Sequence, residues 1–453
     1  SKHKVAADAV DGAAQVINAG LNVRTNFSLP ENFIYPLRHA ISEGKISMQT
    51  IDSRVADVLR VKFMMGLFDN PYKGDTKKLE KVVHCKEHQN VSMRAALESI
   101  VLLKNENNIL PLSKSIKKVA VIGPNAAEVD NLICRYGPAN APIKTVYQGI
   151  KDYLPDSEVR YAKGADIIDE YFPESELYDV PLNKTEETMI DEAVALAKES
   201  DVAIMVLGGN EKTVREEYSR TNLDLCGRQE KLLQAVYATG KPVILVMIDG
   251  RAATINWAER YIPGIVHAWF PGEFMGDAIA KVIFGDYNPG GKLAVTFPRS
   301  VGQIPFAFPF KPGSDSKGFV RVTGSLYPFG YGLSYTTFDY SALKIENPVI
   351  GTQGSVKLSC RVKNTGKIAG DEVVQLYLHD EVSSVTTYVK VLRGFERIHL
   401  QPGEEKVVDF VLTPQDMGLW NKDNHFIVEP GTFAVMVGSS SQDIRLQGKF
   451  EVK

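Results

Sequence analysis

The stretch PVILVMI (Pro242–Ile248) is an unbroken apolar run with the length of one strand. Two similar runs precede it, KVAVI (Lys118–Ile122) and VAIMVL (Val202–Leu207), and amphipathic helical patterns precede the second and third runs, at Met189–Lys198 and Gln229–Ala238. Strands that are apolar throughout are typical of strands buried on both faces. Their alternation with helices predicts a mostly parallel sheet with helices on both sides, an α/β sandwich.

The same alternation continues toward the C-terminus. Gly264–Trp269 indicates a fourth strand, Phe274–Phe284 a helix, and Lys292–Phe297 a last strand. We therefore expect the α/β sandwich to occupy residues 93–310.

After a linker at residues 311–335 the pattern becomes all-β. Short runs that alternate apolar and polar residues follow one another with turn residues between them. They predict a β-sandwich of the fibronectin type III or immunoglobulin-like kind over residues 336–453. The expected strands lie in SVKLSCRVKN (355–364), VVQLYLHD (373–380), VLRGFERIHL (391–400), KVVDFVLTP (406–414), GTFAVMVGS (431–439) and RLQGKFEVK (445–453).

Residues 1–69 predict mostly helices. Helical spacing covers Ala6–Asn18, Pro30–Glu43 and residues 51–62, and Leu21–Thr25 resembles one short strand. One strand among helices is an incomplete set of elements, so we expect the edge of a larger α/β structure. The polar stretch 70–92 predicts an irregular linker.

Composition excludes several classes of protein. Among 453 residues, 52 Lys+Arg face 55 Asp+Glu, for a net charge of −3, which offers no basic footprint for nucleic acid or an anionic membrane surface. Apolar runs are far shorter than the ~20 residues of a membrane helix. The four cysteines lie far apart without a CxxC pair, which favours separate thiols over a disulfide framework or a zinc site.

The sharpest candidate for chemistry follows the strand Val202–Leu207. Ligands of open parallel sheets gather beyond the carboxyl ends of the strands, and a carboxylic acid beside an arginine can have its pKa tuned for acid/base work. A solvated charged loop would have the same composition, and spacing alone does not separate the two. The loop contains Glu211, Arg215, Glu216, Glu217, Ser219 and Arg220.

Other chemistries lack their motifs. The turn GPNAAE after Lys118–Ile122 is neither GxGxxG nor GxxxxGK[ST], so the backbone cradle for phosphates is missing. There is no GxSxG elbow, and the eight histidines are scattered along the chain. We therefore expect no metal and no cofactor, and we interpret His267 as a packed core residue.

Several long stretches, in order along the chain, resemble glycoside hydrolase family 3, in particular its multi-domain bacterial β-glucosidases and β-xylosidases. The resemblance implies a (β/α)8 barrel, an α/β sandwich and a fibronectin type III-like domain. It also implies retaining, exo-acting hydrolysis of β-glycosides at the non-reducing end. The matching stretches are NAGLNV (18–23), VLRVKFMMGLFDNP (58–71), ESIVLLKNENNILPL (98–112), KKVAVIGPNA (117–126), REEYSRTNLDL (215–225), GKPVILVMIDGR (240–251), FGDYNPGGKLAVTFPRSVGQIP (284–305) and LYPFGYGLSYTTF (326–338).

The resemblance also implies site residues. The family's acid/base is a glutamate in a pattern like E-x-x-[DS]-R, and Glu216 fits this pattern through Ser219 and Arg220. Glu217, one residue out of register, is the alternative. Arg24 could reach the sugar from the barrel rim or form a structural ion pair, and Tyr136 could stack on the leaving group or be a core residue.

One departure from the family matters. Its nucleophile is an aspartate in an SDW-type motif, which is absent here, and Lys2-His3 do not lie where the family's sugar-binding Lys-His pair does. A barrel needs ~200 residues or more, but only about 69 precede the expected linker. The resemblance thus implies that the chain holds the C-terminal segment of a barrel, just after the nucleophile strand. A second polypeptide would then bring the N-terminal barrel and the nucleophile.

These inferences lead to ranked readings of function. The first is a β-glucosidase-like hydrolase that releases terminal β-D-glucose from a β-linked oligosaccharide or glucoside. A β-xylosidase is the nearest variant, and a non-catalytic carbohydrate-binding or assembly subunit is the alternative of another class. A homo-oligomer stays open, and a secreted or periplasmic location is favoured over a cytoplasmic one.

Overall fold

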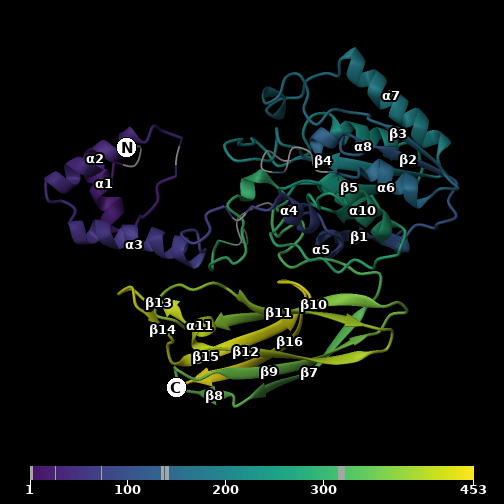
Figure 1. Cartoon of the computed structure of the whole chain (residues 1–453). Coiled ribbons are helices and arrows are strands. Elements are labelled where there is room, and N and C mark those ends of the chain that lie inside the picture. Colours follow the sequence, from purple (N-terminus) through teal and green to yellow (C-terminus); the bar gives the residue numbers. More distant parts are fainter. Residues whose placement is uncertain (1–3, 26, 73, 134–136, 138–141, 315–321) are drawn as a thin grey trace. The chain divides into compact units, whose positions relative to one another are not determined.

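The computed structural model describes residues 4–25, 27–72, 74–133, 137, 142–314 and 322–453. The chain forms two compact units, Ser1–Cys85 and Lys86–Lys453. In Figure 1 the first unit is purple to blue, and the second continues from blue through teal and green to yellow. None of the described helices combines the length and the apolar character needed to cross a bilayer.

The described residues of the first unit form helices without strands. Three of the helices begin at a side-chain cap: Asp8 accepts a hydrogen bond from the N–H of Asp11, Ser47 from that of Thr50, and Asp75 from that of Lys77. Such caps satisfy N–H groups that the first turn of a helix leaves without a partner. The three helices predicted for residues 1–69 are confirmed. The helices of this unit are α1 (Ala9–Asn18), α2 (Glu31–Ser42), α3 (Met48–Met64) and α4 (Thr76–Val82).

Two predictions for residues 1–92 are wrong. Leu21–Thr25 is not a strand, because the described residues of this unit contain no second strand that could pair with its backbone. The stretch 70–92 is not irregular but contains α4 and the start of α5 (Lys86–Ser99). Asp75 caps α4 by accepting a hydrogen bond from the N–H of Lys77 at 3.0 Å, a local signal that outweighs the polar composition.

The first unit has a small core and a bare helix face. Ala14 and Ile17 of α1 are buried against Ala40 of α2. By contrast, none of the residues of α3 is fully buried, and its Val55 and Leu59 are 49% and 38% exposed. Most of α3 thus contributes little to the packing of the described residues.

The second unit begins with the predicted α/β sandwich. Within the described residues its sheet has the strand order β1-β6-β5-β4-β2-β3, in which β2 to β6 run parallel and β1 pairs antiparallel with β6. The strands are β1 (Val101–Asn105), β2 (Lys118–Ile122), β3 (Glu158–Ala162), β4 (Val202–Gly208), β5 (Val243–Ile248) and β6 (Gly264–His267). The helices that accompany them are α5, α6 (Val146–Tyr153), α7 (Lys184–Glu199), α8 (Gln229–Tyr237), α9 (Asn256–Tyr261) and α10 (Met275–Ile283).

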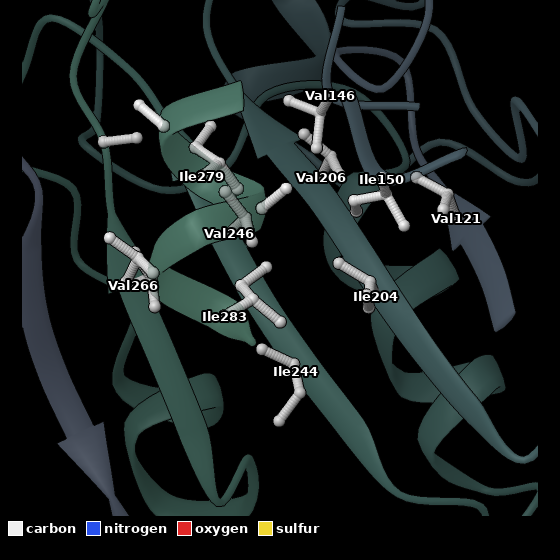
Figure 2. Close-up of a cluster of buried hydrophobic side chains, with 14 of the residues drawn as sticks. Val121, Val146, Ile150, Ile204, Val206, Ile244, Val246, Val266, Ile279 and Ile283 are labelled. Carbon is white, nitrogen blue, oxygen red and sulfur yellow. The ribbon is translucent and has the colours of Figure 1, made fainter. Parts of the chain in front are cut away.

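Alternate side chains of each central strand enter the two cores of this sandwich. Ile204 and Val206 of β4 face α6 and α10, as Figure 2 shows, whereas Met205 lies in the core formed with α7 and α8. Helices α6 and α10 approach closely because glycines meet: a Cβ on Gly149 would lie 2.2 Å from the backbone carbon of Gly276. Burial on both faces explains why these strands are apolar at every position.

The strand predicted at Lys292–Phe297 is not formed. Leu293 and Phe297 are buried, but their backbone makes only isolated hydrogen bonds, with residues 330–331 and 326–327. The edge of the sheet beside β6 is taken by β1 instead. Neither β1 nor β3 was expected, because β1 lies in a stretch without a strand pattern of its own and β3 is short and half polar.

The C-terminal part of the chain is a β-sandwich, as predicted. Its two main sheets, in the described residues, have the orders β11-β10-β15-β16-β8 and β12-β9-β7, and their facing side chains form one core. Burial alternates along β9, which is the period expected of a strand with one solvated face. The elements are β7 (Phe338–Glu346), β8 (Val349–Ile350), β9 (Val356–Asn364), β10 (Gly370–Asp380), β11 (Val391–Leu400), β12 (Glu405–Leu412), α11 (Pro414–Met417), β13 (Leu419–Trp420), β14 (Phe426–Ile427), β15 (Gly431–Gly438) and β16 (Ile444–Val452).

Candidate functional site

A charged loop leaves the carboxyl end of β4, the position at which parallel sheets bind their ligands. We call residues 209–228 the acidic loop. Gly208, paired with Ile248 of β5, has φ +142°, and a Cβ there would lie 2.0 Å from the carbonyl oxygen of Ile248. A glycine is therefore required where the chain turns out of the sheet.

The first residues of the acidic loop are held by amide and hydroxyl groups. Asn210 donates its backbone N–H to Thr213 Oγ1 at 3.0 Å and its Nδ2 to Asn131 Oδ1 at 2.8 Å. Asn125, fully buried after β2, donates its Nδ2 to the carbonyl oxygens of Gly209 and Ile248, both at 3.1 Å. The start of the loop is thus fixed to the ends of three neighbouring segments.

The far side of the loop is held by a buried ion pair. The side chains of Arg220 and Glu176 are 6% and 5% exposed, and Arg220 Nε donates to Glu176 Oε1. The other oxygen, Oε2, accepts from the N–H of Thr221 at 3.0 Å and from its hydroxyl at 2.8 Å. Asn222 Nδ2 donates to the Glu176 carbonyl oxygen at 3.1 Å. Both carboxylate oxygens therefore have partners, as a buried charge requires.

The tip of the loop is exposed between these two attachments. Glu216 and Glu217 are both exposed, and Glu217 has φ +69°, the left-handed region that non-glycine residues rarely adopt. Arg215 stacks on the ring of Tyr218, with its guanidinium carbon 3.8 Å from the ring centre. Arg251 Nη2 donates to the Tyr218 carbonyl oxygen at 2.8 Å. The carboxylates thus reach solvent from a tip with an ordered backbone.

One further carboxylate lies beside the loop. Asp249, directly after β5, is buried and accepts a hydrogen bond from the N–H of Arg251 at 3.0 Å. Burial raises the pKa of Asp249 to about 6, although Arg220 and Arg251 oppose the rise. A carboxylate with such a raised pKa at this edge of the sheet is typical of a functional cleft.

Sequence reasoning singled out neither Glu176 nor Asp249. Glu176 lies 44 residues before Arg220, in a polar segment, and nothing in that segment signals burial. Asp249 did have a signal, since it is a single carboxylate at the end of an apolar strand next to β4.

The other two predicted site residues are Arg24, in the first unit, and Tyr136. Arg24 is exposed in the first unit, where its guanidinium carbon lies 4.8 Å from the centre of the Phe33 ring and its Nη2 lies 3.5 Å from Ser28 Oγ. Its alternative as a structural ion pair has no support from these contacts. Tyr136 lies outside the described residues. Arg24 and Tyr136 as residues that bind substrate therefore stay predictions.

His267 packs against an aromatic ring, and the described cysteines are free thiols. His267 is fully buried, its ring 4.2 Å from that of Trp269, and burial lowers its pKa to about 3. Among the described residues, Cys85, Cys226 and Cys360 are free thiols, and no three His, Cys, Asp or Glu side chains are grouped as a metal site would need.

The fold and the loop define a class: an α/β sandwich with a carboxylate-bearing loop at the carboxyl edge of its sheet, followed by an all-β domain. The chain belongs to glycoside hydrolase family 3. Residues 100–335 match the glycosyl hydrolase family 3 C-terminal domain, and residues 372–441 match the fibronectin type III-like domain.

Individual relatives are similar over nearly the whole chain. A β-xylosidase of Formosa agariphila is 40% identical over 97% of this chain, and a periplasmic β-glucosidase of Salmonella typhimurium is 38% identical over all of it. The chain covers 61% of the length of each.

Solved structures give the same picture. A β-glucosidase from Erythrobacter marinus superimposes with a TM-score of 0.90 at 36% identity. A mutant β-glucosidase from Listeria innocua, in complex with laminaribiose, superimposes with a TM-score of 0.87 at 29% identity. In both cases all of this chain is covered and 61% of the solved chain.

Proposed function

We propose that this chain contributes the general acid/base to a retaining, exo-acting β-glycoside hydrolase of the β-glucosidase type, and that Glu216 is that residue. The observation that carries the proposal is the exposed Glu216 on a loop held on both sides by buried contacts. A positioned carboxylic acid protonates the leaving oxygen and typically contributes ~10²–10⁴-fold to the rate. The relatives named β-glucosidase support the substrate class.

Retaining hydrolysis needs a second carboxylate ~5–5.5 Å from the first, which attacks the anomeric carbon. We assign it to the N-terminal portion of a barrel, with the first unit as the barrel's C-terminal segment. The exposed apolar side chains of α3, such as Val55 and Leu59, support a missing neighbour, because their burial would contribute ~25 cal/mol per Å². The relatives also extend well beyond the length of this chain.

Glu217 is the alternative acid. Its backbone has φ +69°, in the left-handed region. Glu216→Gln and Glu217→Gln form a matched pair, because both residues are exposed on the same loop and both variants remove one negative charge.

The test is hydrolysis of aryl β-glucosides by the purified chain, alone and after addition of the N-terminal barrel polypeptide. Toward phenyl β-glucoside, activity should appear on mixing, fall at least 100-fold with Glu216→Gln, and change little with Glu217→Gln. Azide should restore turnover of Glu216→Ala on an aryl β-glucoside with a good leaving group, because the azide anion attacks the glycosyl-enzyme in place of water and needs no general base. The product is then β-glucosyl azide. A folded complex without activity would refute the proposal.

A β-xylosidase is the second candidate, favoured by the relative of that name at 40% identity. The same assay decides between them when aryl β-xylosides are compared with aryl β-glucosides. The aryl glycoside with the larger kcat/KM identifies the sugar that the enzyme prefers.

A further inference from the structure

A cavity of about 590 Å³ opens in the β-sandwich, apart from the acidic loop. It lies beside α11 and β13, which gather at one end of the sandwich in Figure 1, and reaches β10, β11 and the segment between them. Buried Leu378 and Phe433 form part of its wall. Its volume falls within the ~300–1,000 Å³ of small-molecule sites.

An exposed tryptophan stands at this cavity. Trp420 is 65% exposed, an uncommon state for so large an apolar ring. The ring is nonetheless braced: its centre lies 5.7 Å from that of Phe426, edge to face, and the two residues are cross-strand partners in β13 and β14. Phe426 in turn covers Gly418, where a Cβ would meet the ring at 2.4 Å. The contact with Phe426 therefore fixes the exposed indole of Trp420 in place.

A second aromatic ring and four charged groups complete the lining. Tyr388 is 42% exposed, and Lys311 Nζ lies 6.0 Å from its ring centre. Asp380 and Arg393 are partly buried, and burial raises the pKa of Asp380 and lowers that of Arg393. In the described part of the chain, Arg393 Nε is buried without a hydrogen-bond partner. A group with donors and acceptors would satisfy it.

The balance of these charges argues for an uncharged ligand. Lys311 and Arg393 are countered by Asp380 and Asp416, so the cavity favours neither anions nor cations. Exposed aromatic faces contact the C–H faces of sugar rings, and charged planar side chains bond to hydroxyl groups. An apolar ligand would leave these polar groups without partners.

We propose that this cavity is an accessory binding site for a neutral β-linked oligosaccharide, with Trp420 as its stacking platform. The β linkage rests on the proposed function, because a substrate held here raises its local concentration near the hydrolytic domain. The site itself stands on the cavity and its lining.

The test is ¹⁹F NMR of the full chain labelled with 5-fluorotryptophan. The chain has three tryptophans, so Trp420→Phe identifies the signal of Trp420 by its loss. Cellotetraose or xylotetraose should shift this signal saturably. Trp420→Ala removes this signal, so binding to that variant is followed by the same titration on Tyr388, in a chain labelled with 3-fluorotyrosine. The variant should bind the tetraose at least tenfold more weakly.

Phe395→Ala is the matched control, because Phe395 is also 65% exposed in the same β-sandwich but does not line the cavity. It should leave the affinity unchanged. Glu216→Gln should also leave it unchanged, whereas aryl β-glucoside hydrolysis by the assembled enzyme should survive Trp420→Ala. Failure of this site and failure of the proposed function are thus distinguishable. No shift of the Trp420 signal at millimolar tetraose, or a shift with α-linked maltotetraose alone, would overturn the proposal.

Discussion

Glu176→Gln removes the charge that faces Arg220 while it keeps the volume of the side chain. The two groups are buried, and deleting one partner of a buried ion pair typically costs ~3–5 kcal/mol, because the other charge stays unpaired. Glutamine can still accept from Arg220, but its NH₂ then faces the N–H and hydroxyl of Thr221, which both donate to Glu176. We expect a loss of ~3 kcal/mol, concentrated in the acidic loop.

Hydrogen exchange of the Thr221 amide measures this loss directly, since the amide donates to Glu176 at 3.0 Å. A loss of ~3 kcal/mol corresponds to exchange about 100-fold faster. Glu211→Gln is the control on the same loop: its ion pair with Arg215, at 3.1 Å, is partly exposed and worth less than ~1 kcal/mol. Exchange at Thr221 should change no more than a few-fold in the control.

The double variant Glu176→Met/Arg220→Met makes the test stricter. Two apolar side chains leave no buried charge, so the double variant should be less destabilised than the sum of the two single variants by ~1 kcal/mol or more. The reasoning is refuted if Glu176→Gln leaves Thr221 exchange within threefold of the parent chain, or if the two single effects simply add.

Two further predictions concern stability. Burial lowers the pKa of His267 to about 3, so the stability that the neutral ring contributes is complete above the unfolded pKa near 6.5 and is lost as the pH falls toward 3. His267→Phe should therefore remove ~2 kcal/mol of the loss in unfolding free energy between pH 6.5 and 4.5, and an unchanged pH slope in urea titrations would contradict this. Gly276→Ala places a Cβ 2.2 Å from the carbonyl oxygen of Thr145 and should lower the free energy of unfolding by ~3 kcal/mol. The control is Gly12→Ala, whose Cβ would have its nearest neighbour 3.6 Å away, and which should be neutral or stabilising by ~0.5–1 kcal/mol. Equal urea midpoints for the two variants would be inconsistent with the glycine contact.

The sheet was largely predictable, because a strand that is buried on both faces is apolar at every position, and this pattern is visible in the local sequence. The apolar runs at Val202–Gly208 and Val243–Ile248 identify their strands without any knowledge of their neighbours. Lys292–Phe297 has a similar apolar pattern but forms no strand: Val295 is 43% exposed, and the backbone makes only isolated hydrogen bonds. A strand also needs a neighbouring strand to pair with, and the edge position beside β6 is taken by β1, which is distant from β6 in the sequence.

The candidate site was predictable only in part for the same physical reason. Glu216 follows a recognisable strand and fits a local pattern. The support of its loop comes from Glu176 and Asn125, which are joined to it by hydrogen bonds across long sequence separations. Trp420 could not be distinguished from a core residue, because its exposure depends on how the hairpin of β13 and β14 packs.

The most direct test of Glu216 as proton donor is the dependence of kcat/KM on the leaving group, measured for the chain assembled with the N-terminal barrel polypeptide. A poor leaving group needs protonation and a good one does not. Glu216→Gln should therefore retain most activity toward 2,4-dinitrophenyl β-glucoside and lose ~10²-fold or more toward phenyl β-glucoside. Equal losses for both substrates, or the same selective loss in Glu217→Gln instead, would contradict the assignment.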